Sequence, residues 1–136
     1  MPDVAELLKE RGVQPSAQRV AVAKYALSTH DHPSADEVWE RVRRALPTIS
    51  RATVYNTLNL FADKGLISRH VIAEGRVVFD SVVEPHHHFI DETTGRIHDV
   101  PWDAIRVTGV EGLSGFDVRS HQVVMRGRRS ARSKNR

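Results

Sequence analysis

The sequence predicts an α+β protein made of two small units, and three observations support this. Apolar residues recur at helical spacing through roughly the first 65 residues, with capping residues between the stripes. Two short apolar runs then flank the turn-forming pair Glu74-Gly75, which indicates paired strands. From about residue 83 the pattern alternates as in short β-strands. We therefore expect units at 1–82 and 83–127, followed by a basic tail at 128–136.

Four helices are expected in the first unit, over residues 3–12, 16–28, 34–46 and 51–65. Ser34 and Glu37 have the S-x-x-E spacing of a capping box at the start of the third helix. Ser50 is suited to cap the fourth helix. The apolar stripe of that helix consists of Val54, Leu58 and Phe61.

The third and fourth helices, separated by the short break PTIS, predict a helix-turn-helix, and the strand pair that follows would form the wing of a winged helix. Asn56 faces away from the apolar stripe and Tyr55 lies at its edge. An asparagine amide can pair with adenine, and a tyrosine ring can pack on a thymine methyl group. We therefore predict that double-stranded DNA contacts Arg51, Tyr55 and Asn56. The alternative is that these residues only solvate an ordinary helix.

Short strands are expected in the second unit at 86–91, 96–100 and 116–127, with a short helix near 102–113. About fifty residues bury too little surface to be stable alone, so we expect a homodimer, which also matches a palindromic DNA site. The apolar residues expected to pack in the dimer include Val118, Val123 and Met125.

Composition limits the location and the chemistry. The chain has no apolar run of about 18 residues and no basic region followed by an apolar core at its start, so we expect a cytoplasmic protein that does not enter a membrane. It has no cysteine, which excludes disulfides and cysteine zinc sites. Six of the 20 lysines and arginines lie in the final segment RGRRSARSKNR. This basic end is typical of a disordered tail or of a phosphate contact.

Three consecutive histidines, His86, His87 and His88, begin an expected strand. Side chains alternate along a strand, so His86 and His88 should point one way and His87 the other. Imidazole binds zinc, iron and manganese, and carboxylates complete sites for harder divalent ions. Surface histidine clusters also bind metals adventitiously, so the spacing leaves both interpretations open. The other candidate ligands are His32 in an interhelical loop, Asp80 before the expected hinge, and Asp99 on the next strand.

Four motifs occur in order: HPSADEVWE, ISRATVYNTLNLFADKGLI, GRVVFD and HHHF. Together they resemble the ferric uptake regulator (Fur) superfamily of metal-responsive repressors, over about Leu8 to Gly127. The chain is most similar to the peroxide-sensing (PerR-like) and iron-response (Irr-like) branches, whose recognition helix also contains TVYN. The resemblance implies a winged helix-turn-helix domain joined by a hinge to a small α/β dimerisation domain.

The resemblance also implies a regulatory metal site at His32, Asp80, His86, His88 and Asp99. Two of these ligands belong to the first unit and three to the second, so a bound ion would fix the hinge. It would thereby hold two winged helices at the spacing of successive major grooves, about 34 Å or a multiple of it. We expect Fe²⁺ or Mn²⁺ there, with Zn²⁺ able to occupy the site in vitro.

The chain departs from the family pattern at several positions. Members commonly hold structural zinc with two Cys-x-x-Cys pairs, but Asp91 and Thr94 replace the first pair and RGRRSAR replaces the second. No structural zinc held by four cysteines is therefore expected. Gln14 stands where a basic residue often enters the minor groove, which puts that contact in doubt.

A further family metal site would use His87 and His121. Phe89 and Arg106 stand where its other ligands are required. An intact second metal site is therefore not expected.

We expect a metal-dependent transcriptional regulator, not an enzyme, that senses Fe²⁺ or Mn²⁺, with peroxide as an additional signal, and binds an AT-rich inverted repeat. The alternative is a haem-responsive iron regulator, because His86, His87 and His88 resemble the histidine tract that iron-response regulators use toward haem. A non-haem metalloenzyme is a remote alternative. It would leave the helix-turn-helix unexplained.

Overall fold

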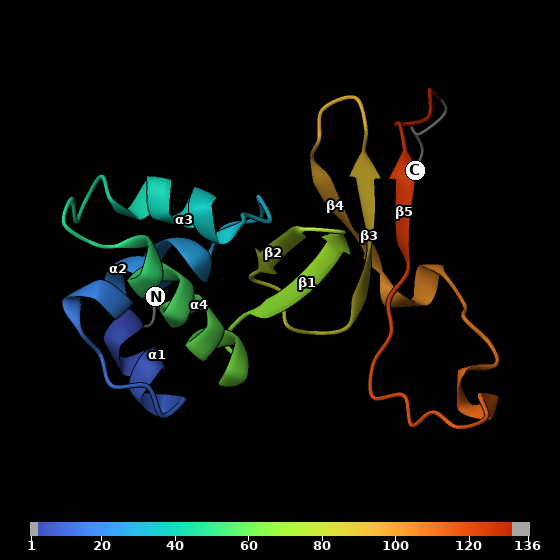
Figure 1. Ribbon diagram of the computed structural model, residues 1–136, viewed down its shortest axis with the longest axis horizontal. Coiled ribbons are helices and arrows are strands. Elements are labelled where there is room, and N and C mark those ends of the chain that lie inside the picture. The colour runs from blue at the N-terminus through green and yellow to red at the C-terminus, as the bar shows by residue number, and fades with distance from the viewer. Residues whose placement is uncertain (1–2, 132–136) are drawn as a thin grey trace. The chain divides into compact units, whose positions relative to one another are not determined.

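The computed structural model describes residues 3–131, and the chain divides into two compact units, 1–83 and 84–136. Figure 1 labels the helices and strands of both units. Among the described residues, no helix is long and apolar enough to span a membrane. The tail expected at 128–136 lies outside the described residues from 132 onward.

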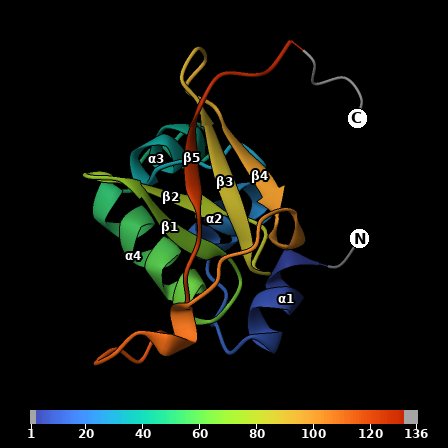
Figure 2. The same cartoon turned by 90° about the vertical axis from the view of Figure 1, so that its right-hand side faces the viewer.

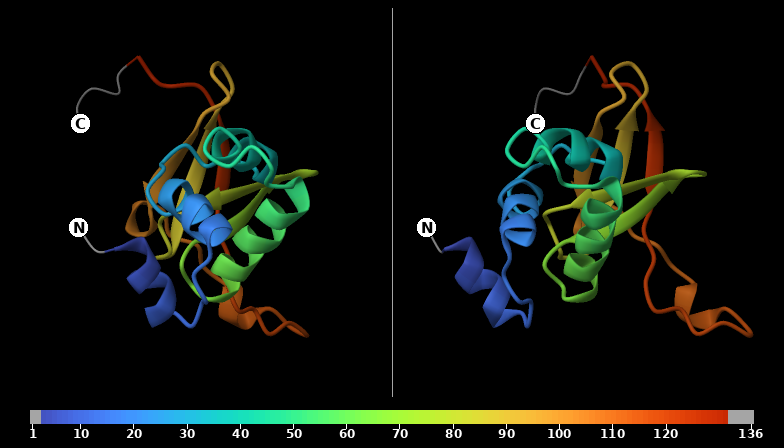
Figure 3. Two further views of the ribbon diagram at one scale, coloured as in Figure 1. Left: turned by 90° about the vertical axis from the view of Figure 1, so that its left-hand side faces the viewer. Right: turned by 60° about the vertical axis from the view of Figure 1, so that its left-hand side comes forward.

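The N-terminal unit contains four α-helices followed by a two-stranded antiparallel sheet. Their bounds are α1 Val4–Glu10, α2 Ala17–Ala26, α3 Ala35–Val42, α4 Arg51–Asp63, β1 Ser68–Ala73 and β2 Arg76–Asp80. All four expected helices and the strand pair across Glu74-Gly75 are confirmed. In Figure 3, α2, α3 and α4 pack against one another, which is the arrangement of a helix-turn-helix domain.

Side-chain caps determine where α3 and α4 begin. The Ser34 hydroxyl accepts the N–H of Glu37 at 3.2 Å, while the Glu37 carboxylate accepts the N–H of Ser34 at 2.8 Å, so the predicted capping box is confirmed. The Ser50 hydroxyl accepts the N–H of Thr53 at 3.0 Å, which starts α4 at Arg51. The second cap decides which residues occupy the first turn of α4.

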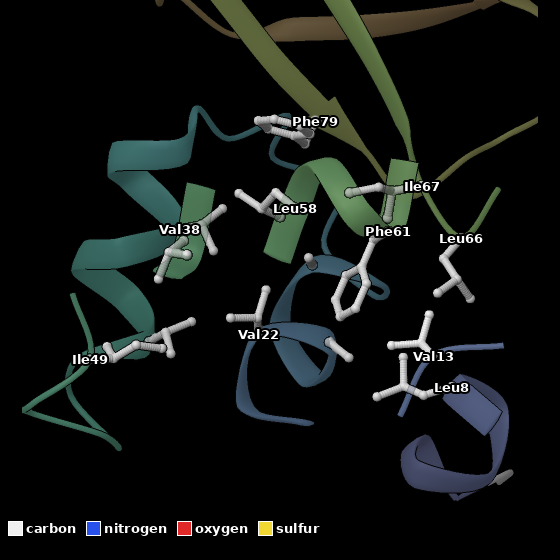
Figure 4. Packing of buried hydrophobic residues seen from close by; sticks show 14 residues of the cluster. Leu8, Val13, Val22, Val38, Ile49, Leu58, Phe61, Leu66, Ile67 and Phe79 are labelled. Carbon is white, nitrogen blue, oxygen red and sulfur yellow. The ribbon is translucent and has the colours of Figure 1, made fainter. Parts of the chain in front are cut away.

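One apolar core joins the four helices of this unit. The predicted stripe of α4, Val54, Leu58 and Phe61, is fully buried. Figure 4 shows Phe61 and Leu58 between side chains of the other helices. Burying a side chain of this size contributes about 1.5–3 kcal/mol. Because this stripe faces the core, the opposite side of α4 remains on the surface.

The C-terminal unit is built on a three-stranded sheet. Its strands are β3 His86–Asp91, β4 Ile97–Pro101 and β5 Val124–Gly127. Figure 2 shows β3 between its neighbours, antiparallel to β4 and parallel to β5. This register places His88 directly opposite Asp99.

The prediction of a helix near 102–113 is wrong. The chain forms two short 3-10 turns there, η1 Trp102–Ala104 and η2 Val110–Gly112. Gly109 lies between them with φ of 90°, a left-handed conformation that a continuous α-helix does not contain.

The strand predicted over 116–127 is too long, because only Val124–Gly127 pairs with β3. Pairing begins where Val124 meets His88, and the preceding N–H, that of Val123, donates instead to the ring of His87. The His87 side chain therefore takes the N–H group that would have continued the pairing of β5 with β3. Val118 lies before this point and outside any strand.

Hydrogen bonds close the turn between β3 and β4, where the family pattern has its first cysteine pair. The Asp91 carboxylate accepts the N–H of Thr93 at 2.9 Å, and this bond holds the pKa of Asp91 below its ordinary value. The N–H of Gly95 donates to the Asp91 carbonyl at 2.7 Å, and the N–H of Arg96 to the Thr94 hydroxyl at 3.2 Å. Backbone and side-chain hydrogen bonds therefore hold this turn.

Candidate metal centre and nucleic-acid interface

The N-terminal unit brings two of the five candidate ligands together. His32 lies in the loop between α2 and α3, Asp80 ends β2, and Nε2 of His32 is 3.1 Å from Oδ2 of Asp80. Both side chains are buried. His32 also has φ of 53°, a left-handed conformation that costs a residue other than glycine about 1–3 kcal/mol. Such strain persists only where the surrounding structure holds it in place.

Two hydrogen bonds fasten the His32 loop to β2 and the chain after it. The N–H of Phe79 donates to the Pro33 carbonyl at 2.8 Å, and the Ser81 hydroxyl donates to the Thr29 carbonyl at 2.8 Å. They flank Asp80 on both sides along the chain. The separation of His32 and Asp80 is therefore fixed by the backbone of this unit.

His70 is a further candidate ligand that the sequence reasoning missed. One of its ring nitrogens lies within 4.8 Å of a carboxylate oxygen of Asp80. An irregularity in the pairing between Val71 and Ala73 shifts the register of β1, so that Ser68 lies opposite Asp80 and His70 shares its face of the sheet. In the sequence, His70 is only a histidine on the expected strand that pairs with the strand of Asp80. The bulge that brings the two side chains to one face cannot be recognised from the sequence.

The C-terminal unit positions the other three candidate ligands. The Nε2 atoms of His86 and His88 lie 3.3 Å and 3.6 Å from the same oxygen of Asp99, Oδ1. The two imidazole rings are 4.6 Å apart. The prediction that both point to one face of the strand is confirmed.

Hydrogen bonds on the far side of these two rings determine which nitrogen carries the proton. Nδ1–H of His86 donates to the Glu84 carbonyl at 2.7 Å, and Nδ1–H of His88 donates to Oε1 of Gln122 at 2.8 Å. In a neutral ring, Nε2 then carries a lone pair. Both lone pairs face the Asp99 carboxylate, an arrangement that is repulsive without a proton or a metal ion between them. Metal-binding imidazoles usually donate their other N–H in this way, so the residues fit a divalent ion.

His87 does not belong to this cluster. Its ring stacks on Trp102, with ring centres 4.6 Å apart and planes inclined by 13°. The histidine tract considered for haem is therefore divided between two faces of β3.

The surface of α4 presents the predicted DNA-binding residues. Asn56 is exposed and Tyr55 is 55% exposed, so their outward orientation agrees with the helical pattern. Asn56 also lines a surface groove with Arg19 of α2. Further along α4, the side chain of Asn59 accepts a hydrogen bond from Arg69 of β1 at 2.6 Å. Polar groups suited to bases and cations suited to phosphates therefore share this surface.

Arg51, the first residue of α4, lies against an indole ring. Its guanidinium carbon is 4.4 Å from the ring centre of Trp39, and that of Arg43 is 4.5 Å from the same ring. The indole N–H of Trp39 donates to the Ile49 carbonyl at 3.0 Å, which fixes the ring. These two cations, at the end of α3 and the start of α4, suit phosphate contacts better than base contacts.

Arg19 is a cation near the position where the family pattern has a basic residue and this chain has Gln14. Its guanidinium donates to the Gln14 carbonyl at 2.9 Å. The family pattern points only to position 14, so it does not identify Arg19.

A winged helix followed by a unit that carries paired imidazoles and a carboxylate defines the class of metal-dependent, DNA-binding regulators. The chain belongs to the Ferric uptake regulator family, whose model matches residues 10–126. The peroxide-responsive repressor PerR of Staphylococcus aureus is 32% identical over 122 residues, which cover 88% of this chain and 82% of that protein.

Solved structures show the same relationship. A zinc-bound manganese uptake regulator is 31% identical with a TM-score of 0.68, over 95% of this chain and all of that one (100%). The ferric uptake regulator of Vibrio cholerae is 26% identical with a TM-score of 0.70, over 91% and 98%. The fold is thus an N-terminal DNA-binding domain with a C-terminal domain that is built here on a small three-stranded sheet. The protein is a metal-dependent transcriptional regulator, so the metalloenzyme alternative is wrong.

Proposed function

We propose that the protein is a homodimeric, cytoplasmic repressor that binds an AT-rich inverted repeat in response to Fe²⁺ or Mn²⁺. The observation that carries the proposal is the pair of imidazoles, His86 and His88, whose Nε2 lone pairs both face Asp99. These three residues would hold the ion from the C-terminal unit. His32 and Asp80 would complete its coordination from the N-terminal unit.

Because the ligands come from two units, binding one ion would restrict how those units are arranged. An ion shifts such an equilibrium only by its differential affinity for the arrangements, typically about 1–3 kcal/mol, or roughly 5- to 150-fold in DNA affinity. In this proposal Tyr55 and Asn56 contact base edges, and Arg51 contacts a phosphate.

A DNA-binding titration tests the proposal. The operator is first selected from random duplexes with Mn²⁺ present, and its affinity is then measured with metal-free protein and after Mn²⁺ addition. Mn²⁺ should raise operator affinity by a factor within the range above. Equal affinity with and without the ion would contradict a metal-responsive repressor.

We propose more specifically that the protein senses peroxide, and its similarity to a peroxide-responsive repressor supports this. Bound Fe²⁺ would supply one-electron redox chemistry beside His32 and His86. After Fe²⁺ and peroxide, mass spectrometry should find one added oxygen, taken from peroxide as water leaves, on one of these histidines. Treatment with Mn²⁺ and peroxide is the control and should add none. If the histidines stay unmodified and DNA binding is retained, the peroxide part of the proposal is contradicted and only iron sensing remains.

Haem ligation by the whole histidine tract is not favoured. His86 and His88 face one side of β3, and His87 stacks on Trp102 at the other. The three rings therefore cannot meet at one iron while this strand is intact.

Dimerisation is proposed to occur through the C-terminal unit and without metal. The side chains proposed for this contact are the exposed apolar residues of the segment after β4 that lie outside the His87 pocket described below: Leu113, Phe116 and Val118. Sedimentation in chelator should show a dimer at micromolar concentration, and Phe116→Asp should shift it toward monomer because Phe116 is 74% exposed. Val71→Asp is the matched control, since Val71 is 64% exposed in the other unit. A folded wild-type monomer would overturn this prediction.

A further inference from the structure

The C-terminal unit contains a polar pocket whose lining includes none of the candidate metal ligands. Its volume is about 510 Å³, and its lining includes His87, Trp102, Asp103, Arg106, Glu111 and His121. Pockets for small molecules generally measure about 300–1,000 Å³. Trp102 forms an aromatic wall, because its ring stacks on His87 and lies 5.0 Å from that of His121. The pocket is therefore large enough for a small organic ligand.

His87 is protonated at the opposite nitrogen from its two neighbours in the sequence. The backbone N–H of Val123 donates to Nδ1 of His87 at 2.9 Å, so Nδ1 carries the lone pair and Nε2 carries the hydrogen in the neutral ring. The side chain is 0% exposed, and Nε2 has no hydrogen-bond partner among the residues that the structure describes. Leaving a buried donor without an acceptor costs free energy, so an acceptor from outside the protein would stabilise this N–H group.

The same hydrogen bond makes His87 a poor metal ligand. Coordination through Nε2 would require that atom to lose its hydrogen and Nδ1 to gain it, which would set two N–H groups of His87 and Val123 against each other. Arg106, which cannot act as a metal ligand, stands in this lining where the family's second metal site requires one. His87 and His121 therefore do not form a second metal site in this chain.

We propose that this pocket binds a small molecule through a carboxylate group. The carboxylate accepts the Nε2–H of His87 and pairs with the guanidinium of Arg106, which has no ion-pair partner among residues 3–131. Asp103 and Glu111 belong to the same lining, and their negative charges oppose a singly charged carboxylate less strongly than a doubly charged phosphate. The ligand class is thus a monocarboxylate with an apolar part against Trp102. This inference does not depend on the proposed function.

Acetate, titrated into metal-free full-length protein labelled with ¹⁵N-histidine, tests the proposal. Before acetate, the NMR spectrum should show His87 protonated at Nε2 and His86 and His88 protonated at Nδ1. Acetate should shift the His87 signal saturably. Acetamide, which offers a neutral acceptor, and inorganic phosphate should each bind at least tenfold more weakly. Chloride at the same ionic strength controls for salt.

Two variants assign the binding to named groups. Arg106→Gln should weaken acetate at least tenfold, whereas Arg119→Gln, a matched control at an exposed arginine outside this pocket's lining, should leave it unchanged. His87→Phe keeps a ring against Trp102 but removes the donor, and should also weaken acetate at least tenfold. Absence of a saturable acetate shift, unchanged affinity in Arg106→Gln, or Zn²⁺ coordination at His87 and His121 would overturn the proposal.

Discussion

Replacing His86 with alanine should abolish the increase in operator affinity that Mn²⁺ produces, a loss of roughly 5- to 150-fold in the presence of the ion. The reason is that the variant removes one of two Nε2 lone pairs directed at Asp99, 3.3 Å from its Oδ1. Affinity without metal and the sedimentation coefficient should stay at wild-type values, because His86 belongs to neither the winged helix nor the exposed apolar segment after β4. Operator binding and sedimentation, each measured with and without Mn²⁺, check this.

His98→Ala is the matched control for His86→Ala. His98 lies on β4 next to Asp99 in sequence, but its side chain points to the other face of the strand and meets the ring of Phe89. The His98→Ala protein should keep the full increase in operator affinity that Mn²⁺ produces. Full Mn²⁺-stimulated affinity in His86→Ala would show that the imidazole pair is not the metal switch.

Replacing Asn56 with alanine should cost about 1–3 kcal/mol on the selected operator and almost nothing on random DNA. Asn56 is exposed on the side of α4 opposite the buried stripe, where its amide can reach a base edge. Preference should relax at one base pair, because only the contact with that base is lost. Affinities for the operator, for single-base variants of it and for random duplexes test both parts.

Asn59→Ala is the comparison, one turn further along α4. The Asn59 side chain is bound to Arg69, so its replacement should not change the preference at any base pair. Equal loss on operator and random DNA in Asn56→Ala would contradict base readout by Asn56.

The N-terminal unit could be predicted from the sequence because its signals are local. Ser34 with Glu37, and Ser50 before the stripe of α4, mark helix starts within a few residues of chain, and the structure forms both caps as predicted. The segment after β4 could not be predicted as well. Its length as a strand depends on which carbonyl or ring nitrogen receives the N–H of Val123, and this partner, His87, is 36 residues away.

In the candidate site, the facing of the side chains on β3 could be predicted from the sequence, but the positions of the ring protons could not. Strand alternation places His86 and His88 on one face, yet the proton positions depend on Glu84, Gln122 and Val123, which alternation does not identify. His70 was missed for a similar reason. The irregularity after Val71 changes which β1 residues share a face with Asp80. No residue type in this segment indicates that irregularity.

The proposed switch requires that one ion is held by ligands from both units of the chain. The most direct measurement is ¹⁵N-histidine NMR of metal-free protein titrated with Zn²⁺, since coordination strongly shifts the resonance of the bound nitrogen. We predict that ring nitrogens of His32, His86 and His88 shift together and that the change is complete at one equivalent per chain. If His86 and His88 shift to completion while His32 remains unchanged, the ion does not join the two units and the proposed switch is contradicted.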